Sequence, residues 1–195
     1  MMQGVFFNNL WAPFILQKLI NAVGFQIVWF TCALGVNYSQ PYSYLIVLTT
    51  TFLFIAHHLY FCSHAISELR FIFKIVFLGW MMDTLLLQNN LISFSSPYTA
   101  PFSLIQPYWM TCLWFALGAT INHSLSWLKK TKAWSTVFGL AFGTLSYLAG
   151  SRFGVIHFES NLGILFTALA WALLVPLFVL ISQCQSLELS QSKSN

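Results

Sequence analysis

The stretch that decides the fold is FIFKIVFLGWMMDTLLLQNNL, residues Phe71–Leu91. It is long enough to cross a bilayer as a helix, since about 20 apolar residues span the hydrocarbon core. It also carries a carboxylate, Asp83, about 18 Å along that helix. Its eleven Leu, Ile, Phe and Val residues favour insertion by about 3–6 kcal/mol, and an aspartate at the centre costs about 3 kcal/mol. The helix is therefore predicted to insert with Asp83 facing protein or water.

The composition of the whole chain indicates an integral membrane protein. Of 195 residues, 58% are hydrophobic and only 6% are charged, and the mean hydropathy is +0.74. A soluble domain carries about 25% charged residues to cover its surface. The net charge of +4 is accordingly read as a determinant of membrane topology and not as a nucleic-acid footprint.

Five further apolar runs have the length of a membrane span, and a segment containing Trp11 and Pro13 before the first of them is predicted to lie at the membrane interface. The five runs are Leu19–Val36, Tyr42–Cys62, Leu104–Leu128, Ala133–Arg152 and Leu162–Ser182. The sequence thus predicts an all-α, polytopic membrane bundle of six transmembrane helices. Residues 1–182 are expected to form one domain, and residues 183–195 a polar, disordered cytoplasmic tail.

The distribution of Lys and Arg predicts the orientation of this bundle. With the N-terminus in the cytoplasm, only Arg152 lies on the opposite side. The cytoplasmic basic residues are then Lys18, Arg70, Lys74, Lys129, Lys130, Lys132 and Lys193. Basic residues are enriched on the cytoplasmic side of membrane proteins. Both termini are therefore predicted to be cytoplasmic, with Glu68 in a cytoplasmic loop.

Polar residues within the predicted spans are the candidates for a site. Asp83 and His123 are candidate catalytic acid–base residues, because a carboxyl and an imidazole can exchange protons with a bound molecule. Asn122, Tyr147 and Arg152 are candidate substrate-binding residues, and Arg152 is also a candidate partner for Asp83. The structural alternative is that these groups only join helices through hydrogen bonds.

The glycines of the fifth run predict close helix packing. Gly139, Gly143 and Gly150 fall on one face at spacings of four and seven residues. Small residues at such spacing let two helix backbones approach each other in a membrane. This face should place Tyr147 near the interior of the bundle.

The cysteines and histidines lead to no predicted metal or cofactor. The four cysteines lack C-x-x-C spacing and lie in or at the ends of apolar runs, which is typical of small packing residues. His57 and His58 are interpreted as side chains that reach the interface at a helix end. A bis-histidine haem site with His123 is geometrically conceivable, because these histidines share one depth.

Several motifs resemble one family of small bacterial membrane proteins. They are FQIVWFTCALG, GWMMDTLLLQNNLISF, PYWMTCLWFALGATINHSLSWL, GTLSYLAGSRFGVIHF and ALAWALLVPL. The chain from Asn21 to Pro176 is similar to the family catalogued as domain of unknown function 2878. The resemblance implies a multi-pass protein of the bacterial inner membrane, and it implies no activity.

Three functions are compatible with these observations. The first is a lipid- or quinone-related membrane enzyme, or an accessory subunit of one, with a buried polar site on the third to fifth helices. The second is a structural or assembly subunit, and the third is a small proton-coupled transporter. The expected partners are membrane lipids and an amphiphilic small molecule, without nucleic acid. A homo-oligomer or a membrane partner is also compatible with the sequence.

Overall fold

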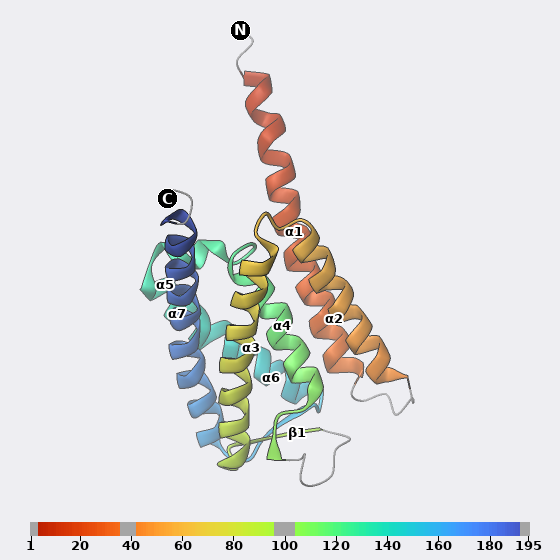
Figure 1. Cartoon of the computed structure of the whole chain (residues 1–195). Helices are drawn as coiled ribbons and strands as arrows, with labels where there is room; N and C mark the ends of the chain where they lie inside the picture. The colour runs from red at the N-terminus through yellow and green to blue at the C-terminus, as the bar shows by residue number, and fades with distance from the viewer. Residues whose placement is uncertain (1–3, 36–41, 96–103, 192–195) are drawn as a thin grey trace.

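The computed structural model describes residues 4–35, 42–95 and 104–191, which are almost entirely helical (Figure 1). The α-helices are α1 (Gly4–Gly35), α2 (Ser43–Tyr60), α3 (Ala65–Gln88), α4 (Tyr108–Ile121), α5 (Lys132–Phe138), α6 (Thr144–Arg152) and α7 (Asn161–Gln191). The prediction of an all-α bundle is confirmed, with one short pair of strands added to it.

Within the described residues, four helical segments are long and apolar enough to cross a membrane. They are Ile15–Gly35 of α1, the whole of α2, the whole of α3, and Asn161–Leu187 of α7. Large apolar side chains point outward from them, such as Phe52 (70% exposed) and Leu173 (74% exposed). A surface of this kind is unfavourable in water, whereas lipid tails are as apolar as the side chains themselves. The helices therefore indicate a membrane protein.

The central helix α4 packs against α1, α2 and α3 and is shorter than expected. Its 14 residues extend about 21 Å, less than the roughly 30 Å of a hydrocarbon core. The helix ends at Ile121, where the chain enters a hydrogen-bonded turn. The backbone N–H groups of His123 and Leu125 both donate to the carbonyl of Thr120, at 3.0 and 2.9 Å. A 3₁₀ turn, η2 (Ser126–Lys130), then completes the predicted fourth run.

Helices α5 and α6 form one helix, joined by the π-helical segment η3 (Gly139–Gly143). This helix packs against α7 over its glycine face. A Cβ atom at Gly139 would lie 2.2 Å from the carbonyl oxygen of Trp171, and one at Gly143 would lie 2.2 Å from the Trp171 ring. Only glycine permits this approach, so the predicted close packing is confirmed.

Two short strands join the ends of α3 and α6. Strand β1 (Ile92–Phe94) pairs antiparallel with β2 (Ile156–Phe158), with Ser93 opposite His157. The pair lies at the end of the bundle away from the start of α1 and the end of α7 (Figure 1). The sequence analysis did not predict these strands.

Three predicted boundaries differ from the ends of the helices in the structure. Helix α1 runs without a break from Gly4, so the expected interfacial segment is not separate from the first span. Helix α3 begins at Ala65, so Glu68 belongs to its first turn and not to a loop. Helix α7 continues to Gln191, through most of the expected disordered tail, and residues 192–195 lie outside the described part. Polar contacts explain this extension, since Gln185 donates to Ser67 of α3.

Candidate functional site

Asp83 is completely buried, and two side chains from other helices hold its carboxylate. Trp114 of α4 donates from Nε1 to Oδ2 at 2.6 Å, and the Tyr147 hydroxyl of α6 donates to Oδ1. Gly79, one turn before Asp83 on α3, makes room for the Trp114 ring, because a Cβ there would lie 2.0 Å from it. Asp83, Trp114 and Tyr147 are called the Asp83 triad below. The triad joins α3, α4 and α6 in the middle of the bundle.

Arg152 does not take part in this triad. It is the last residue of α6 and is exposed. It lies five residues beyond Tyr147, or about 7.5 Å further along the helix axis. Both oxygens of Asp83 already accept hydrogen bonds from neutral donors. The hydrogen-bond partners of Asp83 are therefore Trp114 and Tyr147, and not the candidate Arg152.

A cavity of about 450 Å³ lies beside the Asp83 triad, between α1, α4, the α5–α6 helix and α7. We call it the Tyr147 cavity. Most of its wall is aromatic or aliphatic. Its polar lining residues are Gln26, Thr120, Ser124, Ser146 and Tyr147. A cavity of this size with few polar groups is typical of a site for a small, largely apolar ligand.

Trp171 forms an aromatic wall of this cavity beside Tyr147. Its ring stacks on Trp114 with centroids 5.0 Å apart and meets Tyr147 edge-on at 5.9 Å. The residue is 7% exposed and lines the cavity. Its indole nitrogen is buried and lies close to the Tyr147 hydroxyl. Trp171 therefore helps to hold the Tyr147 hydroxyl in place.

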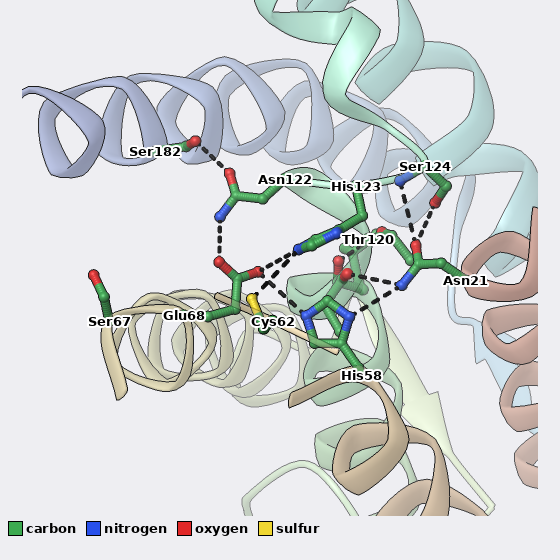
Figure 2. A network of polar contacts seen from close by, with 12 residues as sticks. Asn21, His58, Cys62, Ser67, Glu68, Thr120, Asn122, His123, Ser124 and Ser182 are labelled. Carbon is green, nitrogen blue, oxygen red and sulfur yellow. Dashed lines mark hydrogen bonds and ion pairs between the residues drawn. The ribbon is translucent and has the colours of Figure 1, made fainter. Parts of the chain in front are cut away.

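A second polar centre surrounds Glu68, at the end of the bundle where α2 ends and α3 begins (Figure 2). Its carboxylate atom Oε1 lies 3.4 Å from Nε2 of His58 and 3.4 Å from Nε2 of His123. Asn122 donates from Nδ2 to Oε2 at 2.8 Å. Cys62 completes the group, with Sγ 4.0 Å from Nε2 of His123. These five residues are called the Glu68 cluster below.

Polar residues from α1, η2 and α7 surround the Glu68 cluster. Lys129 donates to Oδ1 of Asn122 at 2.7 Å, and the Ser182 hydroxyl donates to the same oxygen. On the opposite side, Nδ2 of Asn21 lies 3.3 Å from Nδ1 of His58 and donates to the Ala119 carbonyl at 3.0 Å. These contacts fix the orientation of the Asn122 amide and of the His58 ring.

Two groups outside the helical spans have shifted pKa values. Burial lowers the pKa of Lys129, and the negative charge of Glu68 opposes this shift. Burial raises the pKa of the Cys62 thiol, and the charge of Glu68 raises it further, although a backbone hydrogen bond at His64 lowers it. The environment of Cys62 therefore favours the thiol over the thiolate when nothing is bound to it.

The comparison with protein families gives one match. The model described as "Protein of unknown function (DUF2878)" matches residues 18–177, which is more than half of the chain. The chain belongs to this family. The resemblance of its sequence motifs to domain of unknown function 2878 is thus confirmed. Comparisons with curated proteins and with solved structures gave no match.

In this DUF2878 protein the five predicted site residues do not form one site. Tyr147 joins Asp83, whereas Asn122 and His123 join Glu68. Glu68 and Asp83 are 15 residues apart on α3, or about 22 Å along its axis. Arg152 belongs to neither group.

Sequence reasoning missed the acidic centre of the second site and two of its neighbours. Glu68 precedes the apolar run that was taken as the third span, and His58 was interpreted as an interfacial residue, although it is buried. Asn21 lies at the start of the predicted run Leu19–Val36, where a polar residue can reach the membrane interface, so the sequence does not mark it as a site residue. The equal predicted depth of His58 and His123 was the one signal that could have linked α2 with α4.

Proposed function

We propose that the protein binds an amphiphile of the lipid or quinone class in the Tyr147 cavity, and acts on it as a membrane enzyme or as an accessory subunit of one. The observation that carries this proposal is the cavity itself. Trp114 and Tyr147, which hold the buried Asp83, also line it. An apolar cavity with a small number of convergent polar groups is the usual form of a ligand site.

The polar groups suit the head of such a molecule. The Tyr147 hydroxyl donates to Asp83, which leaves its oxygen free to accept a hydrogen bond from a ligand. The Ser146 hydroxyl also lines the cavity and accepts from Nε1 of Trp29 at 2.8 Å, so its own hydrogen can be donated to a ligand carbonyl or hydroxyl. In this arrangement Tyr147 contacts the ligand, and Asp83 is a positioning residue that acts through Tyr147. His123 does not line the cavity and belongs to the Glu68 cluster.

Occlusion of the cavity tests this proposal. Ala149 lines the cavity, and Ala141, on the same helix, does not. The protein and its variants Ala149→Phe and Ala141→Phe are purified in mild detergent and extracted with organic solvent. Mass spectrometry then quantifies phospholipid and isoprenoid quinone separately. We expect the wild type and Ala141→Phe to retain one class of amphiphile, and Ala149→Phe to lose most of it because the phenyl ring fills the space. Equal retention by all three proteins, or no retention by the wild type, contradicts the proposal.

A structural role is the second candidate function. It is favoured by the two protein donors that satisfy both oxygens of Asp83, since a carboxylate held in this way can join helices without any ligand. In that case the Asp83 triad would affect stability alone. Substitutions at Asp83, treated in the Discussion, separate the two candidates.

We also infer that the chain crosses a bacterial inner membrane six times, with both termini in the cytoplasm. The start of α1 and the end of α7 lie toward the same end of the bundle (Figure 1). The joined α5–α6 helix covers residues 132–152, about 31 Å, enough for a fifth crossing, and α4 would provide the sixth with its flanking turns. A green fluorescent protein fused after Asn195 should fluoresce, and alkaline phosphatase fused there should be inactive. The opposite pair of results contradicts this topology.

A further inference from the structure

The Glu68 cluster contains the donor atoms of a metal site, in an arrangement that the sequence analysis did not predict. His58, Cys62 and His123 each offer one ligand atom, and these three atoms all lie within 4.8 Å of one another (Figure 2). They come from the last turn of α2, the α2–α3 connection and the turn after α4. We propose that these three residues bind a divalent transition-metal ion of the zinc type, with Glu68 beside the two imidazoles as a neighbouring negative charge.

The distances are compatible with the spacing of atoms around a metal ion and are long for charge-assisted hydrogen bonds. A charge-assisted N–H···O hydrogen bond is about 2.7–2.9 Å long. Both histidine nitrogens lie 3.4 Å from Oε1 of Glu68. Ligands at about 2.0–2.1 Å from a tetrahedral zinc ion are about 3.3 Å from each other. The 4.0 Å between Sγ of Cys62 and Nε2 of His123 is near the slightly larger spacing expected for a sulfur ligand.

The surroundings hold these donors in place. Asn122 binds Oε2 of Glu68, which leaves Oε1 to face both imidazoles. The Asn21 amide lies at Nδ1 of His58, so that Nε2 is the ring nitrogen on the side of Glu68. Asn122 and Asn21 therefore fix the positions of the Glu68 carboxylate and of the His58 ring beside the proposed ion.

An ion can reach the cluster from the aqueous phase. The site lies at helix ends, and the side chain of His123 is 35% exposed. Cys62 is also partly exposed. Two imidazoles and a thiolate favour zinc and similar ions over Mg²⁺ or Ca²⁺, which prefer oxygen ligands. Binding would release the thiol proton of Cys62 to water and leave a Cys62 thiolate on the metal.

Zinc binding to the full chain in detergent tests the proposal. The protein is stripped with a chelator and desalted, and ZnCl₂ is then titrated while calorimetry and elemental analysis measure the stoichiometry. We expect one zinc ion per chain, and loss of binding in Cys62→Ser and His123→Ala. His57→Ala and His64→Ala are the matched controls, because both histidines are exposed neighbours of the cluster that belong to no ligand group. The controls should bind as the wild type does.

A cobalt titration of the wild type covers the case in which a variant fails to fold. Cobalt bound by Cys62 should give the absorption band of thiolate-to-cobalt charge transfer, and Zn²⁺ should abolish that band by displacement. The proposal is overturned if the wild type gives no such band. It is also overturned if folded Cys62→Ser and His123→Ala bind zinc as tightly as the controls.

Discussion

Replacing Asp83 with leucine is expected to destabilise the bundle severely, whereas replacing it with asparagine is expected to leave the fold in place. Leucine would leave Trp114 Nε1 and the Tyr147 hydroxyl without an acceptor in the interior. An unsatisfied buried polar group costs roughly 1–3 kcal/mol, so the two together cost several kcal/mol. Thermal unfolding in detergent, followed by circular dichroism, measures the difference between the variants.

Asparagine can satisfy the same neighbours with one bond reversed. Its oxygen can accept from Trp114, and its NH₂ group can donate to the Tyr147 oxygen, because a hydroxyl both donates and accepts. The Tyr147 hydrogen would then point toward the cavity, which changes the hydrogen bonding offered to a ligand. We therefore expect Asp83→Asn to alter the amount or class of the retained amphiphile while the melting temperature stays close to that of the wild type.

This pair of variants also separates the two candidate functions. If Asp83→Asn changes only the melting temperature and the retained amphiphile is unchanged, the carboxylate is a structural group and the structural role is correct. If Asp83→Leu is as stable as the wild type, the Asp83 triad does not hold the helices together in the way described above.

Replacing Glu68 is expected to destabilise the protein even when the replacement is glutamine. The NH₂ group of glutamine would face either the imidazoles or the NH₂ group of Asn122. Asn122 cannot turn its amide to accept, because its oxygen already accepts from Lys129 and Ser182. One buried donor is therefore left facing another, at a cost of roughly 1–3 kcal/mol for Glu68→Gln. Glu68→Ala removes the shared acceptor altogether and should cost roughly 3 kcal/mol or more.

Glu159→Gln is the matched control for this series. Glu159 is an exposed carboxylate that accepts a hydrogen bond from Ser93. Exposed contacts of this kind contribute little, so its melting temperature should be unchanged. Equal melting temperatures for Glu68→Gln and Glu159→Gln would show that the polar contacts of the Glu68 cluster drawn in Figure 2 do not stabilise the protein.

Much of the fold follows from apolar runs, because membrane helices must bury their backbone polar groups internally and need about 20 apolar residues. The importance of Asp83 follows from the same reasoning, since it interrupts the run Phe71–Leu91. The hydrogen-bond partners of Asp83 cannot be predicted in the same way. Charge suggested Arg152, but the neutral donors Trp114 and Tyr147 hold the carboxylate, and nothing in a single sequence shows which ring faces which helix.

The Glu68 cluster was harder to predict for a physical reason. A helix can begin in polar sequence when other helices supply hydrogen bonds, and α3 does so at Ala65. The hydropathy of the chain identifies only the apolar part of α3, from Phe71 onward. A prediction based on hydropathy therefore assigns Glu68 to a loop. The contacts that bury Glu68 come from His58 of α2, ten residues away, and from Asn122 and His123 after α4, which are more than fifty residues away.

The most direct test of the central claim is an experimental structure of the protein purified from native membranes with its lipids retained. We expect density for an elongated amphiphile in the Tyr147 cavity, with its polar head within hydrogen-bond distance of the Tyr147 hydroxyl. A cavity closed by side chains, or amphiphile density only on the outer faces of α1, α2 and α7, would contradict the proposed function.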